Sequence, residues 1–258
     1  MLATMPVHPE GPRYRAAVAY LSGLWVPPQV WLPMASFLAH RGWEGALIDT
    51  RELRGGLAAR IDAVAEHLRS LSAPPIVMGH DVGALVAFGV AAQVDVQALV
   101  LMAPLLPGAA GTHAITWSRQ LLWSLLRGRR LGPPTGHVGD AYFAGLPERL
   151  RQEAGLEDAR LLGQLARRRP IARQRVPPPT LVLHGARDPV LDSISARRFA
   201  ATIGADFEEI PDGGRWLVSA PAAPECVRRV HPWLVRQLGE PLLEFHAEAM
   251  ADRDADAD

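Results

Sequence analysis

The chain has 258 residues, of which 48% are hydrophobic, and its 27 basic and 27 acidic residues cancel. This composition is typical of a soluble globular protein of one domain and gives no reason to expect a nucleic-acid partner. No segment reaches the ~18 consecutive apolar residues of a membrane helix, and residues 1–15 lack the apolar run of a signal peptide. The single Cys226 excludes an internal disulfide. We therefore expect a cytoplasmic protein without a membrane partner.

Short apolar strands alternate with helical segments along most of the chain. We expect strands at residues 16–21, 45–49, 75–78, 96–103, 180–183 and 206–210, and helices at 30–41, 57–71, 84–93, 195–203 and 226–238. Continuous apolar strands separated by helices indicate an α/β fold with a mostly parallel, doubly wound sheet that is covered on both faces. Such sheets bind ligands at the carboxyl ends of their strands.

Helical patterns replace this alternation between residues 105 and 179, notably at 115–126 and 156–166. We interpret 105–179 as an inserted helical cap over a core made of 1–104 and 180–240, followed by an acidic, disordered tail at 241–258. The cap has twelve arginines and five acidic residues, a net charge of +7 that suits either a solvated face or an anionic substrate. A possible apolar stripe, predicted to pack on the core or line a pocket, consists of Trp117, Leu121, Leu122, Leu125 and Leu126.

The most informative motif is Gly79-His80-Asp81-Val82-Gly83, which lies between a predicted strand and a predicted helix. This spacing and context are those of a nucleophile elbow, with aspartate where serine is usual. Glycines on both sides permit a strained central residue and a close helix. A carboxylate at this position indicates alkyl rather than acyl chemistry.

From about Ala16 to Leu238 the chain resembles the α/β-hydrolase superfamily, and its elbow is similar to those of members with an aspartate nucleophile, such as haloalkane and fluoroacetate dehalogenases and epoxide hydrolases. Asp49-Thr50-Arg51 looks like the family's Asp-x-Arg, and Asp188 matches the acid that follows a later strand. The resemblance implies backbone oxyanion-hole donors at Leu24 and Val82. The residues expected to line a pocket are Ser22, Trp25, Trp117, Tyr142 and Trp216.

Three features depart from the family pattern. The residues before the first predicted strand are too few for the usual antiparallel pair, so we expect trimmed N-terminal strands. Ser22 occupies the place of a motif histidine, and Arg215 occupies that of the catalytic histidine. Arginine, with a pKa of about 12.5 or more, cannot take a proton from water near neutral pH. We expect Arg215 to bind Asp188, with Asp81 as a second candidate partner, either as a structural bridge or as part of a catalytic site.

Two hypotheses remain open from the sequence. The first is an enzyme that acts, by hydrolysis or otherwise, on a small apolar or anionic molecule through Asp81, Asp188 and Arg215, with His113 or His137 of the cap as a possible substitute base. The second is a catalytically degenerate member that binds a ligand or partner. Neither hypothesis calls for a cofactor or a metal, and the sequence leaves the oligomeric state open.

Overall fold

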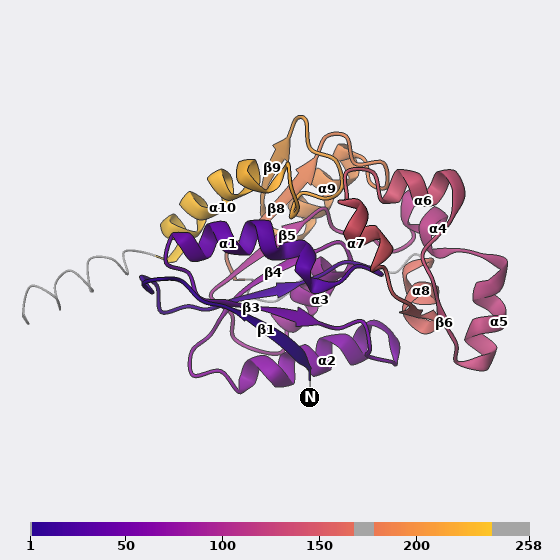
Figure 1. Ribbon diagram of the computed structural model, residues 1–258, viewed down its shortest axis with the longest axis horizontal. Helices are drawn as coiled ribbons and strands as arrows, with labels where there is room; N and C mark the ends of the chain where they lie inside the picture. The colour runs from indigo at the N-terminus through magenta and orange to yellow at the C-terminus, as the bar shows by residue number, and fades with distance from the viewer. Residues whose placement is uncertain (1, 168–177, 239–258) are drawn as a thin grey trace, which may run out of the picture.

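A central sheet of seven strands organises the protein in the computed structural model, which describes residues 2–167 and 178–238 (Figure 1). The strand order is β1-β3-β2-β4-β5-β8-β9, with every neighbouring pair parallel except β1 and β3. The predicted fold class, a mostly parallel sheet, is confirmed. The strands are β1 (Ala3–Val7), β2 (Val18–Leu21), β3 (Gly45–Asp49), β4 (Ile76–His80), β5 (Ala98–Met102), β8 (Thr180–Gly185) and β9 (Asp206–Ile210).

Helices cover both faces of this sheet. In Figure 1, α1 and α10 lie together over one face, and α2 lies on the other. Side chains of one strand alternate between the two cores: Ile76 and Met78 of β4 belong to the first, and Val77 belongs to the second. The helices of the core are η1 (Pro28–Trp31, a 3₁₀ turn), α1 (Leu32–His40), α2 (Gly56–Arg69), α3 (Val82–Val90), α9 (Ser193–Ile203) and α10 (Ala223–Leu238).

Strand β1 is absent from our sequence prediction, which placed the first strand at 16–21. It pairs antiparallel with β3, with Ala3 opposite Asp49. The prediction missed β1 because this strand is largely exposed and contains Pro6, so it lacks the apolar pattern of a buried strand. Within the residues that the structure describes, β1 and β3 form the one antiparallel pair in this sheet.

The cap follows β5 and lies beyond the carboxyl ends of the strands (Figure 1). Two short strands pair within it, and residues 168–177 of the predicted cap and the predicted tail at 241–258 lie outside the described residues. In the described part, the cap elements are α4 (Ala110–Thr116), α5 (Arg119–Arg127), β6 (Arg130–Leu131), α6 (Gly136–Tyr142), α7 (Glu148–Gln152), β7 (Glu157–Asp158) and α8 (Ala159–Leu165).

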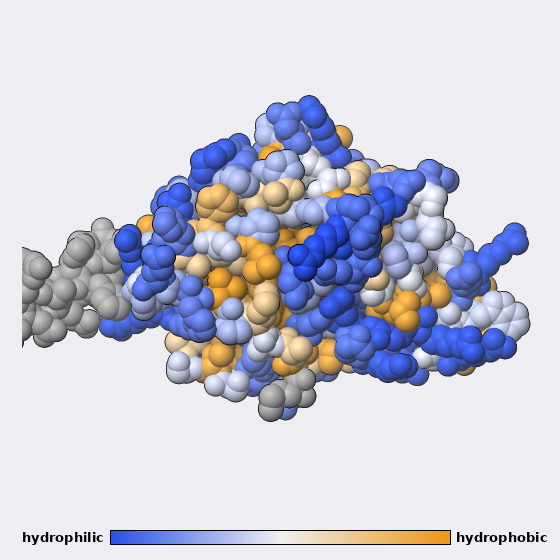
Figure 2. All heavy atoms as spheres, viewed as in Figure 1, coloured by the Kyte–Doolittle hydropathy of each residue, from blue (hydrophilic) through white to orange (hydrophobic). Residues whose placement is uncertain are grey.

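The prediction of a single helix at 115–126 is wrong in one respect, because the helix is interrupted at Trp117. Ser118 begins a new helix there by accepting a hydrogen bond from the backbone N–H of Leu121 at 3.2 Å. The predicted apolar stripe is therefore split: Leu121 is buried, whereas Leu122 is 53% and Leu126 is 80% exposed. Figure 2 shows that polar side chains cover most of the viewed face and that apolar ones gather near its middle.

Trp25 fastens the cap to the core through its backbone and its ring. Its N–H donates to Glu157 Oε1 at 3.0 Å, its carbonyl accepts from Gly155 N at 2.8 Å, and its Nε1 donates to the carbonyl of Leu131 at 3.2 Å. Glu157 also forms a buried ion pair with Arg60 of α2. Burial raises the pKa of Glu157, although the charge of Arg60 opposes this shift. The cap is closed over the sheet by contacts that are costly to break.

No described helix has the length and apolar character needed to cross a membrane.

Candidate active site

The predicted elbow forms a sharp turn between β4 and α3. Asp81 has a φ of 60° and a ψ of −122°, a conformation that a residue with a side chain rarely adopts. The neighbouring glycines permit this turn, because a Cβ on Gly79 would lie 2.2 Å from the carbonyl oxygen of Gly83, and one on Gly83 would lie 2.2 Å from that of Leu21. The Asp81 side chain therefore projects from the carboxyl edge of the sheet, where the sequence placed it.

The first oxygen of the Asp81 carboxylate, Oδ1, lies between two backbone amides. It accepts from Val82 N at 2.5 Å and from Leu24 N at 3.2 Å. These are the two amides that the resemblance assigned to an oxyanion hole. Gly23 allows the close approach, because a Cβ there would lie 2.7 Å from Asp81 Cβ. The positive end of helix α3 adds to the stabilisation of this oxygen.

The second oxygen, Oδ2, is covered by two side chains. Arg215 donates to it from Nε at 3.0 Å and from Nη2, and Tyr142 of the cap donates its hydroxyl at 3.1 Å. The Nη1 of Arg215 binds Asp188 Oδ2 at 2.9 Å. Asp81, Arg215 and Tyr142 are fully buried and Asp188 is 9% exposed. One guanidinium thus bridges two carboxylates, an arrangement we call the Asp81–Arg215–Asp188 bridge.

Burial and charge act on the groups of the bridge. Burial alone would lower the pKa of Arg215, but the charges of Asp188 and Asp81 outweigh it and raise that pKa above its ordinary value. Burial, aided by the charge of Asp81, also raises the pKa of Tyr142 well above its ordinary value. Arg215 is therefore a permanent cation and Tyr142 a permanent hydroxyl donor.

Neighbouring elements hold these side chains in place. Asp188 follows β8 and accepts from the backbone N–H of Val190 at 2.8 Å. Trp216, next to Arg215, donates from its ring nitrogen to the carbonyl of Tyr142 at 2.8 Å. It is 3% exposed, so this predicted pocket residue packs between the core and the cap. Ser22, another predicted pocket residue, is buried, and its hydroxyl has no hydrogen-bond partner in the described part of the chain.

Histidines lie near the bridge without reaching Asp81. His80 Nε2 lies 2.9 Å from the carbonyl oxygen of Arg215, and His184 Nε2 lies 2.9 Å from that of Leu191. Burial lowers the pKa of His80 to about 4, despite the nearby charge of Asp81. Within residues 2–167 and 178–238, the groups that donate to the Asp81 carboxylate come from Leu24, Val82, Tyr142 and Arg215. His113 and His137 are exposed cap residues, and His113 stacks on Trp117.

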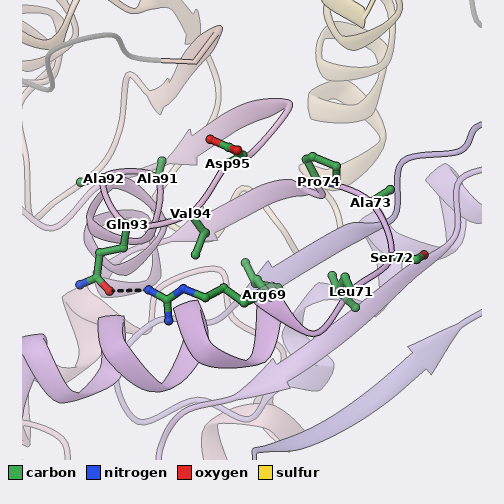
Figure 3. Close-up of a pocket in the computed structure, with 11 residues that line it drawn as sticks. Arg69, Leu71, Ser72, Ala73, Pro74, Ala91, Ala92, Gln93, Val94 and Asp95 are labelled. Atoms are coloured by element: carbon green, nitrogen blue, oxygen red, sulfur yellow. Dashed lines mark hydrogen bonds between the residues drawn. The ribbon is translucent and has the colours of Figure 1, made fainter.

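Two cavities lie away from Asp81. The first, of about 500 Å³, lies at the amino ends of β4 and β5, where Arg69 bonds to Gln93 (Figure 3). That edge is opposite to the one at which parallel sheets bind ligands. The second, of about 480 Å³, lies in the cap, and its lining includes Trp25 and Trp117 but not Asp81. No cluster of three or more potential metal ligands occurs among the described residues.

The sequence prediction brought Asp81, Asp188, Arg215, Leu24 and Val82 to one place, and the structure unites these residues. It did not foresee that Tyr142 donates to Asp81, nor did it single out the buried pair of Arg60 and Glu157. Both depend on how the cap folds over the core. The sequence signal for Tyr142 was its position as the one tyrosine between residues 105 and 179.

Replacing Arg215 with alanine tests the bridge. We expect Arg215→Ala to lower the free energy of unfolding by roughly 3–5 kcal/mol, because two buried carboxylates lose their cation. The matched control is Arg187→Ala, which removes an ion pair with Asp212 whose side chains are 71% and 85% exposed. This control should cost about 1 kcal/mol or less. Urea unfolding measures both, and equal losses would contradict a bridge that stabilises the fold.

Acid should destabilise the protein through His80. The unfolded chain binds a proton at His80 below about pH 6.5, whereas the folded chain does so only near pH 4. Stability therefore falls as the pH is lowered through this window, by about 3 kcal/mol for this group. His80→Gln retains a donor for the Arg215 carbonyl but does not titrate, so its unfolding free energy should depend less on pH. A slope equal to that of wild type, with the exposed His8→Gln as control, would refute this role.

Comparison with known proteins agrees with this architecture. A model of the alpha/beta hydrolase family matches residues 18–224. Similar solved structures include a monoacylglycerol lipase from Paleococcus ferrophilus, with 15% identity, coverage of 92% of this chain and 99% of that one, and a TM-score of 0.72. A thermophilic esterase from Thermogutta terrifontis has 20% identity, coverage of 92% and 94%, and a TM-score of 0.65. An enol-lactonase from Burkholderia xenovorans LB400 has 16% identity, coverage of 90% and 96%, and a TM-score of 0.64.

Comparison with curated protein sequences gives no match. At these identities the similar structures establish the fold alone. The family model, however, spans most of the chain, including the elbow and both segments that supply the bridge. The chain belongs to the alpha/beta hydrolase family.

Proposed function

We propose that this member of the family binds a small molecule without hydrolysing it, and that Asp81 is a structural carboxylate. One observation carries the proposal: both oxygens of Asp81 are already occupied by donors of the protein, in a fully buried site. Each carboxylate oxygen offers about two lone-pair sites, and Oδ2 has three donors around it. The carboxylate has little capacity left for a substrate.

Acyl chemistry is disfavoured because the oxyanion hole is filled. An ester substrate needs the amides of Leu24 and Val82 to stabilise the negative oxygen of its tetrahedral intermediate. Those amides instead bind Asp81 Oδ1. A serine at position 81 would leave them open, since its single oxygen is the attacking atom.

Alkyl chemistry is disfavoured at the other oxygen. With Oδ1 between the amides, Oδ2 is the atom that would attack a carbon and form an enzyme ester. Arg215 and Tyr142 cover Oδ2, and a carbon must displace both to reach it. Hydrolysis of the ester would then need a base within hydrogen-bond reach, and Arg215 cannot supply one.

A second candidate function, an alkyl-transferring hydrolase, is favoured by the position of Oδ1. In an ester of Asp81 this atom would be the carbonyl oxygen, and the two amides would stabilise it when water attacks. For this chemistry Arg215 must leave Oδ2, which breaks a buried pair at a cost of roughly 3–5 kcal/mol. Unless substrate binding supplies this free energy, the contacts of Asp81 favour binding of a small molecule without hydrolysis.

Intact-mass analysis and hydrolysis assays distinguish the two candidates. We expect wild-type protein to gain no covalent mass after incubation with haloalkanes, epoxides or esters, and to hydrolyse none of them faster than Asp81→Asn does. Arg215→His should uncover Oδ2 and provide a base, so we expect adducts or turnover with at least one alkylating compound. The matched control is Arg187→His, the same exchange at an exposed site, which should behave as wild type.

Thermal unfolding confirms that each variant is folded before it is assayed. An ester on Asp81 of the wild-type protein would contradict the proposal. Turnover by wild type that disappears in Asp81→Asn would contradict it as well, and would favour the alkyl-transferring hydrolase.

A further inference from the structure

The cap cavity has the lining of a binding site. Its volume of about 480 Å³ falls within the range of pockets for small molecules. Two indole rings, two prolines and several aliphatic side chains line it together with the polar residues Thr116, Ser118, Arg119, Gln120 and Thr135. The lining includes Trp25, Ile115, Trp117, Arg119, Val138 and Leu162.

This cavity is separate from the elbow. Trp25 forms part of its wall, and the edge of Tyr142 packs against Trp25 with ring centroids 5.4 Å apart. Both rings are fully buried, and Tyr142 in turn contacts Asp81. Two aromatic rings therefore stand between the cavity and the carboxylate, so that a ligand in the cap does not touch Asp81.

Charge at the rim selects the ligand further. Arg119 is the one charged side chain in the lining, and it makes no hydrogen bond or ion pair with another residue in the described ranges. The hydroxyl of Thr135, also in the lining, does not bond to the helix that it precedes. An unpaired guanidinium beside an aromatic and apolar wall suits a molecule with an apolar body and one carboxylate.

We propose that the cap cavity binds small aromatic carboxylates, with the ring against Trp25 and Trp117 and the carboxylate on Arg119. The inference rests on the proposed function, because it names the ligand class that the protein would bind without turnover. Leu162 and Ile115 are buried residues of the lining, 1% and 6% exposed. Trp117, which is 47% exposed, lies at the open side.

Calorimetric titration with 4-phenylbutanoate tests the proposal, alongside its amide and the corresponding amine, which keep the apolar body and change the head group. We expect the carboxylate to bind best and the amine to show no binding. Arg119→Gln should weaken carboxylate binding about tenfold, which corresponds to ~1.4 kcal/mol. The matched control is Arg127→Gln, at the other end of the same helix and outside the lining, which should bind as wild type does. Val138→Trp should abolish binding by filling the cavity.

Any of three results would overturn the inference. These are equal binding of the carboxylate and the amine, equal effects of the two arginine variants, and no binding of the carboxylate at millimolar concentration. These outcomes do not bear on the proposal that Asp81 is a structural carboxylate, because intact-mass analysis tests that role separately. Binding that persists in Val138→Trp would place the ligand elsewhere and would also overturn it. Carboxylate binding at the cavity together with Asp81-dependent turnover would overturn the proposed function while retaining the cavity.

Discussion

The ion pairs of Arg215 with Asp81 and Asp188 are the interaction on which the site depends. Two carboxylates and one guanidinium lie in a region that water does not reach, and such charges persist only when every one of them is paired and hydrogen-bonded. The amides of Leu24 and Val82 and the hydroxyl of Tyr142 complete that pairing. The strained turn at Asp81 is what brings its carboxylate within reach of all these donors.

The closed cap follows from the same constraint. Tyr142 belongs to the cap, and its removal from the core would expose Oδ2 to solvent or leave one donor fewer on a buried charge. Trp25 and Glu157 hold the other side of the cap, next to the loop that carries Leu24. Tyr142 and Trp25 thus contribute to the packing of the cap on the core, and a cavity of about 480 Å³ remains inside the cap.

Much of this architecture was predictable because it rests on local patterns. Buried parallel strands are continuous apolar runs, and the glycines around Asp81 mark a turn that few other residues permit. The pairing of Arg215 with Asp188 and Asp81 was expected from the resemblance to the family, which matches Arg215 to the catalytic histidine and Asp188 to the acid. Three features were not predictable because they leave no periodic signal in the sequence. Strand β1 is an exposed edge strand, and the helix break at Trp117 occurs without glycine or proline. The third feature is the contact of Tyr142 with Asp81, which depends on how the cap folds.

A high-resolution crystal structure is the most direct test of how Asp81 is surrounded. We expect Oδ1 of Asp81 to lie between the amides of Leu24 and Val82, and Oδ2 to lie against Arg215 and Tyr142, with no water or open cavity at either oxygen. An Arg215 side chain turned away from Asp81, with solvent at Oδ2 or a histidine within hydrogen-bond reach of it, would contradict a structural role for Asp81.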